Sequence, residues 1–161
     1  MNSEFKAFQK LVTNPFKYKA FLITKLPMGL FAGLKILHLS ESACSVSVKY
    51  KRINTNPFKS IYFAVLSMAA ELSTGTLALG HVYKRKQHVS TLIVKVEGEF
   101  YKKAVGKITF TCNDGPAIAD AVEQTIATKQ GVTVQAVSIG INEAGEEVAR
   151  FVFTWSFKGK S

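Results

Sequence analysis

One carboxylate stands alone in an almost wholly apolar stretch of the sequence. Glu71 is the only acidic residue between Glu41 and Glu97, and the residues around it, at positions 68–75, are apolar or small. A carboxylate in such surroundings loses solvation, which raises its pKa and makes it a candidate general base. The alternative is that Glu71 faces a wet groove or a subunit interface and makes only a hydrogen bond.

The stretch that holds Glu71, residues 61–79, is near membrane-spanning length. A charge at its centre would cost about 2.5–3.5 kcal/mol on insertion scales, and its Ala, Ser, Thr and Gly residues lower its hydrophobicity. Because strand-like segments follow it, we expect a buried helix of a soluble domain, roughly over residues 59–76. An apolar helix needs burial on all sides, and a curved antiparallel sheet wrapped around it would provide that burial. The expected fold class is therefore α+β.

Alternating side chains predict the strands of this sheet. Cys44, Val46 and Val48 share one face of their segment, while serines and lysines occupy the other. The last segment carries a row of aromatic residues, from Phe151 to Phe157, for which core packing is the expected use. We expect a strand pair over residues 35–52 and strands over residues 82–96, 100–112, 132–141 and 147–158, with a turn at 97–98 and a hairpin loop at 142–145.

Apolar spacing and capping signals predict three further helices. Residues 4–12 place apolar side chains on one face, and Asn14 precedes a proline as the N-cap of a second helix that Pro27 ends. Asp114 begins a third helix, for which Gly131 is a candidate C-cap. The two leading helices are basic and amphipathic; such helices can lie on a membrane, but packing on the domain is the commoner outcome.

Length and composition describe one globular domain. The chain has 161 residues, of which 47% are hydrophobic, and we expect a helical extension over residues 1–25 followed by a single domain over residues 26–161. Two cysteines are too few for a disulfide scaffold, and neither they nor the three histidines have a metal-ligand spacing. We therefore expect no metal and a reducing, cytoplasmic location.

The positive charge is concentrated in the first part of the chain. The net charge is +10, of which residues 1–60 carry +8 and residues 61–161 carry +2. A phosphate-bearing molecule, an acidic carrier protein or an anionic membrane surface would be attracted, although a lysine-rich solubilising surface explains the charge equally well. Nucleic acid is disfavoured as a partner because the basic residues are eighteen lysines and only three arginines.

The run that contains Glu71 resembles the hot-dog fold thioesterases, in particular an uncharacterised bacterial branch (DUF4442-like) related to the PaaI-like acyl-CoA thioesterases. In that superfamily an Asn precedes a helix that opens with His-Gly-Gly and carries Asp or Glu nine residues after the His, followed by Gly. Here Asn56, Glu71 and Gly75 stand at the Asn, acid and glycine positions. Tyr62 takes the place of the His, so Tyr-Phe-Ala replaces His-Gly-Gly, whose glycines let N–H groups approach the thioester oxygen. The resemblance covers most of residues 26–158.

The resemblance implies both a fold and a chemistry. The fold is a hot-dog domain, a curved antiparallel sheet around a central helix, here with two additional N-terminal helices. The chemistry is hydrolysis of a fatty or aryl acyl thioester, in which Glu71 activates water or attacks the carbonyl and Asn56 positions the water or the carbonyl. Ser60 and Tyr62, in the first turn of the helix, would contribute an N–H or a hydroxyl.

The resemblance also implies a substrate-binding surface and an assembly. Hot-dog domains form dimers whose sheets join edge to edge, so we expect a homodimer or a dimer of dimers with the site between subunits. The alternatives are a non-catalytic acyl- or lipid-binding protein on the same fold, which the missing His-Gly-Gly favours, and a membrane-surface protein that uses residues 1–25. Coenzyme A enters as part of the substrate, so no separate cofactor is expected. Basic residues would contact its phosphates, and the candidates are Lys84, Arg85, Lys102 and Lys103. The alternative is that these residues are only solvated strand ends.

Overall fold

The computed structural model describes residues 2–159, which contain six strands and five α-helices. The helices are α1 (Phe5–Thr13), α2 (Pro15–Lys25), α3 (Pro27–Ala32), α4 (Phe63–Val82) and α5 (Gly115–Thr128), with a short 3-10 turn at Arg52–Asn54. The strands are β1 (Lys35–Leu39), β2 (Cys44–Lys49), β3 (Val89–Phe100), β4 (Lys107–Cys112), β5 (Gly131–Ile141) and β6 (Glu147–Gly159).

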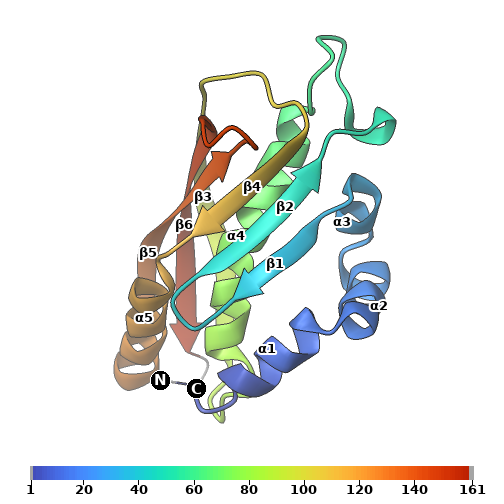
Figure 1. Ribbon diagram of the computed structural model, residues 1–161. Helices are drawn as coiled ribbons and strands as arrows, with labels where there is room; N and C mark the ends of the chain where they lie inside the picture. Colours follow the sequence, from blue (N-terminus) through green and yellow to red (C-terminus); the bar gives the residue numbers. More distant parts are fainter. Residues whose placement is uncertain (1, 160–161) are drawn as a thin grey trace.

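All strands join one antiparallel sheet in the order β1-β2-β4-β5-β6-β3, and the long helix α4 lies against the sheet (Figure 1). β1 and β2 form the predicted strand pair, and β5 and β6 flank the predicted hairpin loop at residues 142–145. β3 pairs with β6 and forms one edge of the sheet. This arrangement confirms the predicted α+β fold, in which a curved antiparallel sheet wraps around an apolar central helix.

The sequence-based prediction was wrong at β3. Glu97 and Gly98, predicted as a turn, lie inside β3 and pair with Val152 and Phe151 of β6. Gly98 makes room for the ring of Phe151, because an added Cβ would lie 2.8 Å from Cε1 of that ring. The prediction was wrong because a glycine that accommodates a ring looks, in sequence, like a glycine that turns the chain. The connection from β3 to β4 is made instead by residues 101–106.

α4 begins four residues later and ends six residues later than predicted. Lys59 has a positive φ of 59°, which a right-handed helix does not allow, and a bridge between Thr55 and Ile61 closes the loop before the helix. Gly80 lies inside the helix near its end, and its missing side chain lets the ring of Phe5 pack directly against the backbone.

α4 forms the centre of the core. It is long and apolar enough to cross a membrane, with a mean hydropathy of 1.3, but 61% of that apolar window is buried inside the domain. Ala69, Ala70 and Leu77 are almost completely inaccessible to solvent. The aromatic residues of β6 are buried in the same core, which confirms their predicted packing role: Phe151, Phe153, Trp155 and Phe157.

α5 begins after Asp114 as predicted, but its end differs. The helix closes at Lys129, which adopts a left-handed conformation (φ 58°) and donates its N–H to Thr125 O. Gly131, predicted as the C-cap, is the first residue of β5. The prediction was wrong because the position that glycine usually takes is filled here by a lysine two residues earlier.

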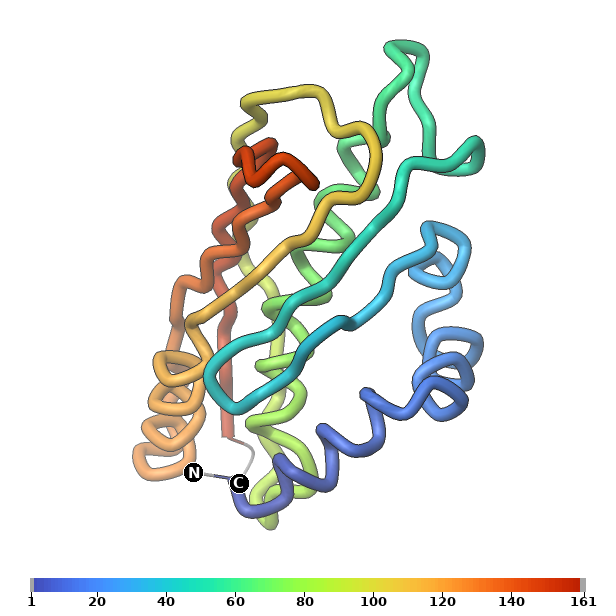
Figure 2. The backbone as a smooth tube through the Cα atoms, in the orientation of Figure 1, coloured from blue at the N-terminus to red at the C-terminus, as the bar shows by residue number. Residues whose placement is uncertain are grey.

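The N-terminal helices follow the side of β1, as Figure 2 shows. Asn14 caps α2 as predicted, because its Oδ1 accepts hydrogen bonds from the N–H groups of Phe16 and Lys17, both at 3.1 Å. α1 packs on the domain through buried apolar residues on one face. Pro27 does more than end α2: it is the first residue of α3, which the sequence did not predict.

Candidate active site

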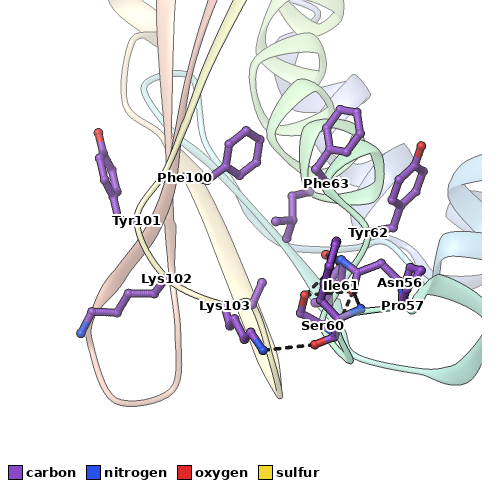
Figure 3. Close-up of a pocket in the computed structure, with 13 residues that line it drawn as sticks. Asn56, Pro57, Ser60, Ile61, Tyr62, Phe63, Phe100, Tyr101, Lys102 and Lys103 are labelled. Atoms are coloured by element: carbon purple, nitrogen blue, oxygen red, sulfur yellow. Dashed lines mark hydrogen bonds between the residues drawn. The ribbon is translucent and has the colours of Figure 1, made fainter.

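Three of the predicted site residues, Asn56, Ser60 and Tyr62, line one cavity at the N-terminal end of α4. The cavity has a volume of about 630 Å³ and lies between the loop before α4, the start of α4 and the segment that follows β3 (Figure 3). Five aromatic side chains form much of its wall: Phe58, Tyr62, Phe63, Phe100 and Tyr101.

Asn56 uses its side chain inside its own loop. Its Oδ1 accepts hydrogen bonds from the N–H groups of Phe58 at 3.0 Å and Ser60 at 3.2 Å, and its Nδ2 donates to Ser60 Oγ at 3.0 Å. These bonds fix the loop that leads into α4. The N-cap position of α4 belongs to Tyr62, so Ser60 and Tyr62 precede the first turn of the helix rather than lying in it.

The first N–H groups of α4 are unpaired. Tyr62 donates its N–H to Asn54 O at 2.8 Å, but the N–H groups of Phe63 and Ala64 have no acceptor among residues 2–159. Free N–H groups at a helix N-terminus carry partial positive charge and can stabilise an anion. The backbone N–H groups of Phe63, which lines this cavity, and of the adjacent Ala64 are therefore available to an oxyanion.

Glu71 lies in a second, smaller cavity of about 270 Å³, whose apolar walls include Phe21, Leu26 and Trp155. Burial raises the pKa of the Glu71 carboxyl. In the described part of the chain no hydrogen-bond donor or ion-pair partner reaches this carboxylate. Gly75, one turn farther along α4, leaves room for it, since an added Cβ there would lie 2.7 Å from Oε1 of Glu71.

A single chain does not bring Glu71 together with Asn56, Ser60 and Tyr62. Phe63 and Glu71 are eight positions apart, which corresponds to about 12 Å along a helix. The two groups also line different cavities. The predicted site therefore divides into a loop group at the start of α4 and a lone carboxylate near the middle of the helix.

Two of the predicted coenzyme A contacts, Lys102 and Lys103, line the first cavity. Lys103 turns toward the loop and donates from Nζ to Phe58 O at 3.3 Å, whereas Lys102 turns away and pairs with Glu146 (Figure 3). Both lysines are exposed, so each can exchange its present contact for a ligand phosphate.

The other two predicted contacts, Lys84 and Arg85, lie beyond the opposite end of α4, roughly 30 Å from its first residue. Arg85 is tied to α5 by an ion pair with Glu123 at 2.7 Å. The structure therefore separates Lys84 and Arg85 from the pair at the first cavity.

Sequence reasoning missed the apolar walls of both cavities. Phe63 of α4 and Phe100 of β3 meet edge to face at 6.2 Å, although they are far apart in the sequence. Phe21 and Trp155 reach the Glu71 cavity from α2 and β6. No spacing in the sequence marks these residues, because only the packing of separate elements brings them together.

The family described as a domain of unknown function, DUF4442, matches residues 17–157 of this chain. The chain belongs to the DUF4442 family. The match runs from α2 to β6, so both cavities lie inside the DUF4442 region. None of the curated proteins matches the sequence.

Solved structures share the fold of this DUF4442 protein. A protein of unknown function from Pseudomonas aeruginosa, described as a probable thioesterase, is 20% identical, with a TM-score of 0.76 over 91% of this chain and 97% of its own. A putative thioesterase from Shewanella oneidensis is 9% identical, with a TM-score of 0.74 over 94% and 97%. A thioesterase from Haemophilus influenzae is 11% identical, with a TM-score of 0.63 over 99% and 93%. These similarities confirm the predicted hot-dog fold of the thioesterase-like proteins.

Proposed function

We propose that this DUF4442 protein hydrolyses a fatty or aryl acyl thioester such as acyl-CoA, with Glu71 as the general base. One observation carries the proposal: the only carboxylate of α4 lies in an apolar cavity, where burial raises its pKa. A carboxylate with a raised pKa is a stronger base near neutral pH. The solved structures of the same fold that are described as thioesterases support the reaction class.

The reaction needs a base, a water molecule and a group that stabilises an oxyanion. The Glu71 carboxylate takes a proton from water while the water oxygen attacks the thioester carbonyl carbon. The resulting oxyanion collapses as the C–S bond breaks, and the thiolate that leaves receives the proton held by Glu71. The products are a carboxylic acid and a free thiol, and no cofactor takes part.

The free N–H groups of Phe63 and Ala64 are suited to hold the oxyanion, but they lie about 12 Å along the helix from Glu71. A site built from two chains removes this distance. We therefore propose that the catalytic unit is a homodimer, in which Glu71 of one copy faces the N-terminus of α4 in the other.

The edge strand β3 supports this dimer. Val96 and Phe100 stand opposite Phe153 and Ala149 of β6, so their side chains lie on the helix side of the sheet, yet both are about half exposed. The free backbone edge of a 12-residue strand also invites a further strand. Antiparallel pairing of two β3 strands about a two-fold axis would cover both residues and set the two α4 helices antiparallel.

The first cavity suits the rest of the substrate. Its aromatic wall offers apolar contact to an acyl or aryl group or to the pantetheine arm, and Lys102 and Lys103 can meet phosphates at its border. An acidic carrier protein would be attracted by the same lysines, so the thiol component is tested with both coenzyme A and carrier-protein thioesters.

The testing experiment measures free-thiol release from acyl thioesters of coenzyme A and of an acyl carrier protein, with short, long and aryl acyl groups. We expect wild type to turn over at least one of them and Glu71→Gln to lose about 100-fold or more in kcat. Glu143→Gln, in the β5–β6 loop, is the matched control and should keep wild-type activity. Full activity in folded Glu71→Gln would show that the base lies elsewhere.

The second candidate function is acyl binding without catalysis. It is favoured by the replacement of His-Gly-Gly with Tyr-Phe-Ala and by the use of Asn56 and Ser60 inside their own loop. It predicts a lipid or acyl ligand that remains bound through purification, detectable by native mass spectrometry. Absence of thiol release from every substrate, together with such a ligand, would favour binding over hydrolysis.

A further inference from the structure

α2 and α3 each expose large apolar side chains that do not pack on the domain. Phe16 and Ile23 of α2 are 86% and 54% exposed, and Met28 and Phe31 of α3 are 64% and 62% exposed. We call these four residues the α2–α3 face. They contrast with α1, whose apolar side chains are buried in the domain.

The helical periodicity of α2 explains why Phe16 and Ile23 are both exposed. At 3.6 residues per turn, Phe16 and Ile23 fall on the side opposite Tyr18 and Leu22. Leu22 is buried, and Tyr18 donates its hydroxyl to Leu34 O at 3.2 Å, so that side faces the domain. Both leading helices were expected to pack on the domain. α1 buries its apolar face there, whereas α2 buries only one side and leaves Phe16 and Ile23 exposed.

The segment that carries the α2–α3 face is positively charged. Residues 5–40 contain six lysines and no acidic residue. Lys17 and Lys19 belong to α2, and Lys25 of the same helix lines the Glu71 cavity instead. Within residues 2–159 none of these lysines forms an ion pair. An exposed apolar face bordered by unpaired lysines is typical of a helix that lies in the interface of an anionic membrane.

We propose that the α2–α3 face docks on an anionic lipid surface, with its four apolar side chains in the acyl boundary and Lys17 and Lys19 at the lipid phosphates. A second copy of the chain fits this face poorly, because it would bring two segments of charge +6 together. A nucleic acid fits poorly as well, because the basic residues of this segment are all lysines and it has no arginine fork for phosphates and base edges.

Docking would connect the membrane to the Glu71 cavity. Phe21 and Lys25, on the inner side of α2, line that cavity, while Phe16 and Ile23 point outward from the same helix. A lipid-bound α2 would thus hold the cavity beside a membrane from which long-chain acyl thioesters can partition. This last consequence rests on the proposed hydrolase function, whereas the docking itself does not.

The test is flotation of the full chain with vesicles of phosphatidylcholine, with and without phosphatidylglycerol. We expect binding only to the anionic vesicles and its loss at high salt. Each lysine near an anionic surface changes binding roughly fivefold, so Lys17→Gln/Lys19→Gln should bind roughly 25-fold more weakly. Phe16→Ser/Ile23→Ser should abolish the binding that remains at moderate salt.

Control variants at other sites distinguish docking through the α2–α3 face from attraction by the overall positive charge of the chain. Lys86→Gln/Lys158→Gln removes the same charge from exposed sites outside α2, and Val105→Ser removes an exposed apolar residue from the β3–β4 connection. Both should bind vesicles like wild type.

Equal binding to both vesicle types, or equal loss in the control and α2 variants, would overturn the proposal. A change in molar mass by light scattering in Phe16→Ser/Ile23→Ser, with no vesicle binding by wild type, would instead identify the face as a contact between copies. Thiol release from soluble short-chain acyl-CoA is measured in parallel. It tests the hydrolase function independently, because it requires no vesicle.

Discussion

Gly75→Ala tests whether the position of the Glu71 carboxylate matters. An added Cβ at Gly75 would lie 2.7 Å from Oε1 of Glu71, whereas ordinary contacts begin at 3.4 Å. The carboxylate oxygen therefore has to move by about 0.7 Å. The same Cβ would lie 3.4 Å from two ring carbons of Trp155, which is an ordinary contact, so only the flexible end of Glu71 has to yield.

The expected effects of Gly75→Ala on stability and on activity have opposite signs. Alanine is favoured over glycine in a helix interior by about 0.8–1.0 kcal/mol, so the free energy of unfolding should rise or stay the same. A general base displaced by part of an ångström should lower kcat/KM by about 10- to 100-fold. Urea unfolding measures the first effect, and thiol release from acyl-CoA measures the second.

Full activity in a stable Gly75→Ala protein would refute the reasoning, because the carboxylate would then work from a displaced position. The double variant Glu71→Gln/Gly75→Ala is the control. If the added methyl group acts only through the carboxylate, the double variant should be no less active than Glu71→Gln alone. A further loss in the double variant would mean that the methyl group blocks the substrate instead.

Two other predictions concern stability and assembly. Burial raises the pKa of Glu71 in the folded chain, so the folded state holds this proton more tightly than the unfolded state, and stability falls as the pH rises from the ordinary glutamate pKa through the raised one. Glu71→Gln should therefore have a higher Tm than wild type at pH 7. This gain in Tm should disappear below about pH 4, where Glu71 of wild type is protonated in both the folded and the unfolded state. A gain that is the same at both pH values would contradict the burial argument. Light scattering should give a molar mass of two chains for wild type and of one chain for Val96→Lys. The control Lys95→Gln, at the adjacent position, should remain a dimer. A dimer that survives Val96→Lys would place the interface away from β3.

Local signals in the sequence predicted the local structure well. Asn14 followed by proline predicted the cap of α2, and the loop at residues 142–145 lies between β5 and β6 as expected. The alternation of β6 predicted which of its aromatic residues are buried. These features depend on contacts within a few residues or on a simple period, which the sequence shows directly.

Features set by contacts between distant elements could not be predicted in the same way. Gly98 looks like a turn signal in the sequence, but it makes room for Phe151 of another strand, as Gly80 makes room for Phe5 of α1. Glu71 was found because a lone acid in an apolar run is visible in the sequence. Its separation from Asn56 was not visible, because the loop before α4 and the late start of the helix determine it.

The most direct measurement is the pH profile of thiol release from acyl-CoA for wild type and Glu71→Gln. If Glu71 is the base, kcat/KM of wild type should rise with pH through a single ionisation whose midpoint lies above the ordinary glutamate pKa of about 4.3. Glu71→Gln should lose about 100-fold or more and show no such rise. A rise that persists unchanged in folded Glu71→Gln would contradict the assignment of Glu71 as the base.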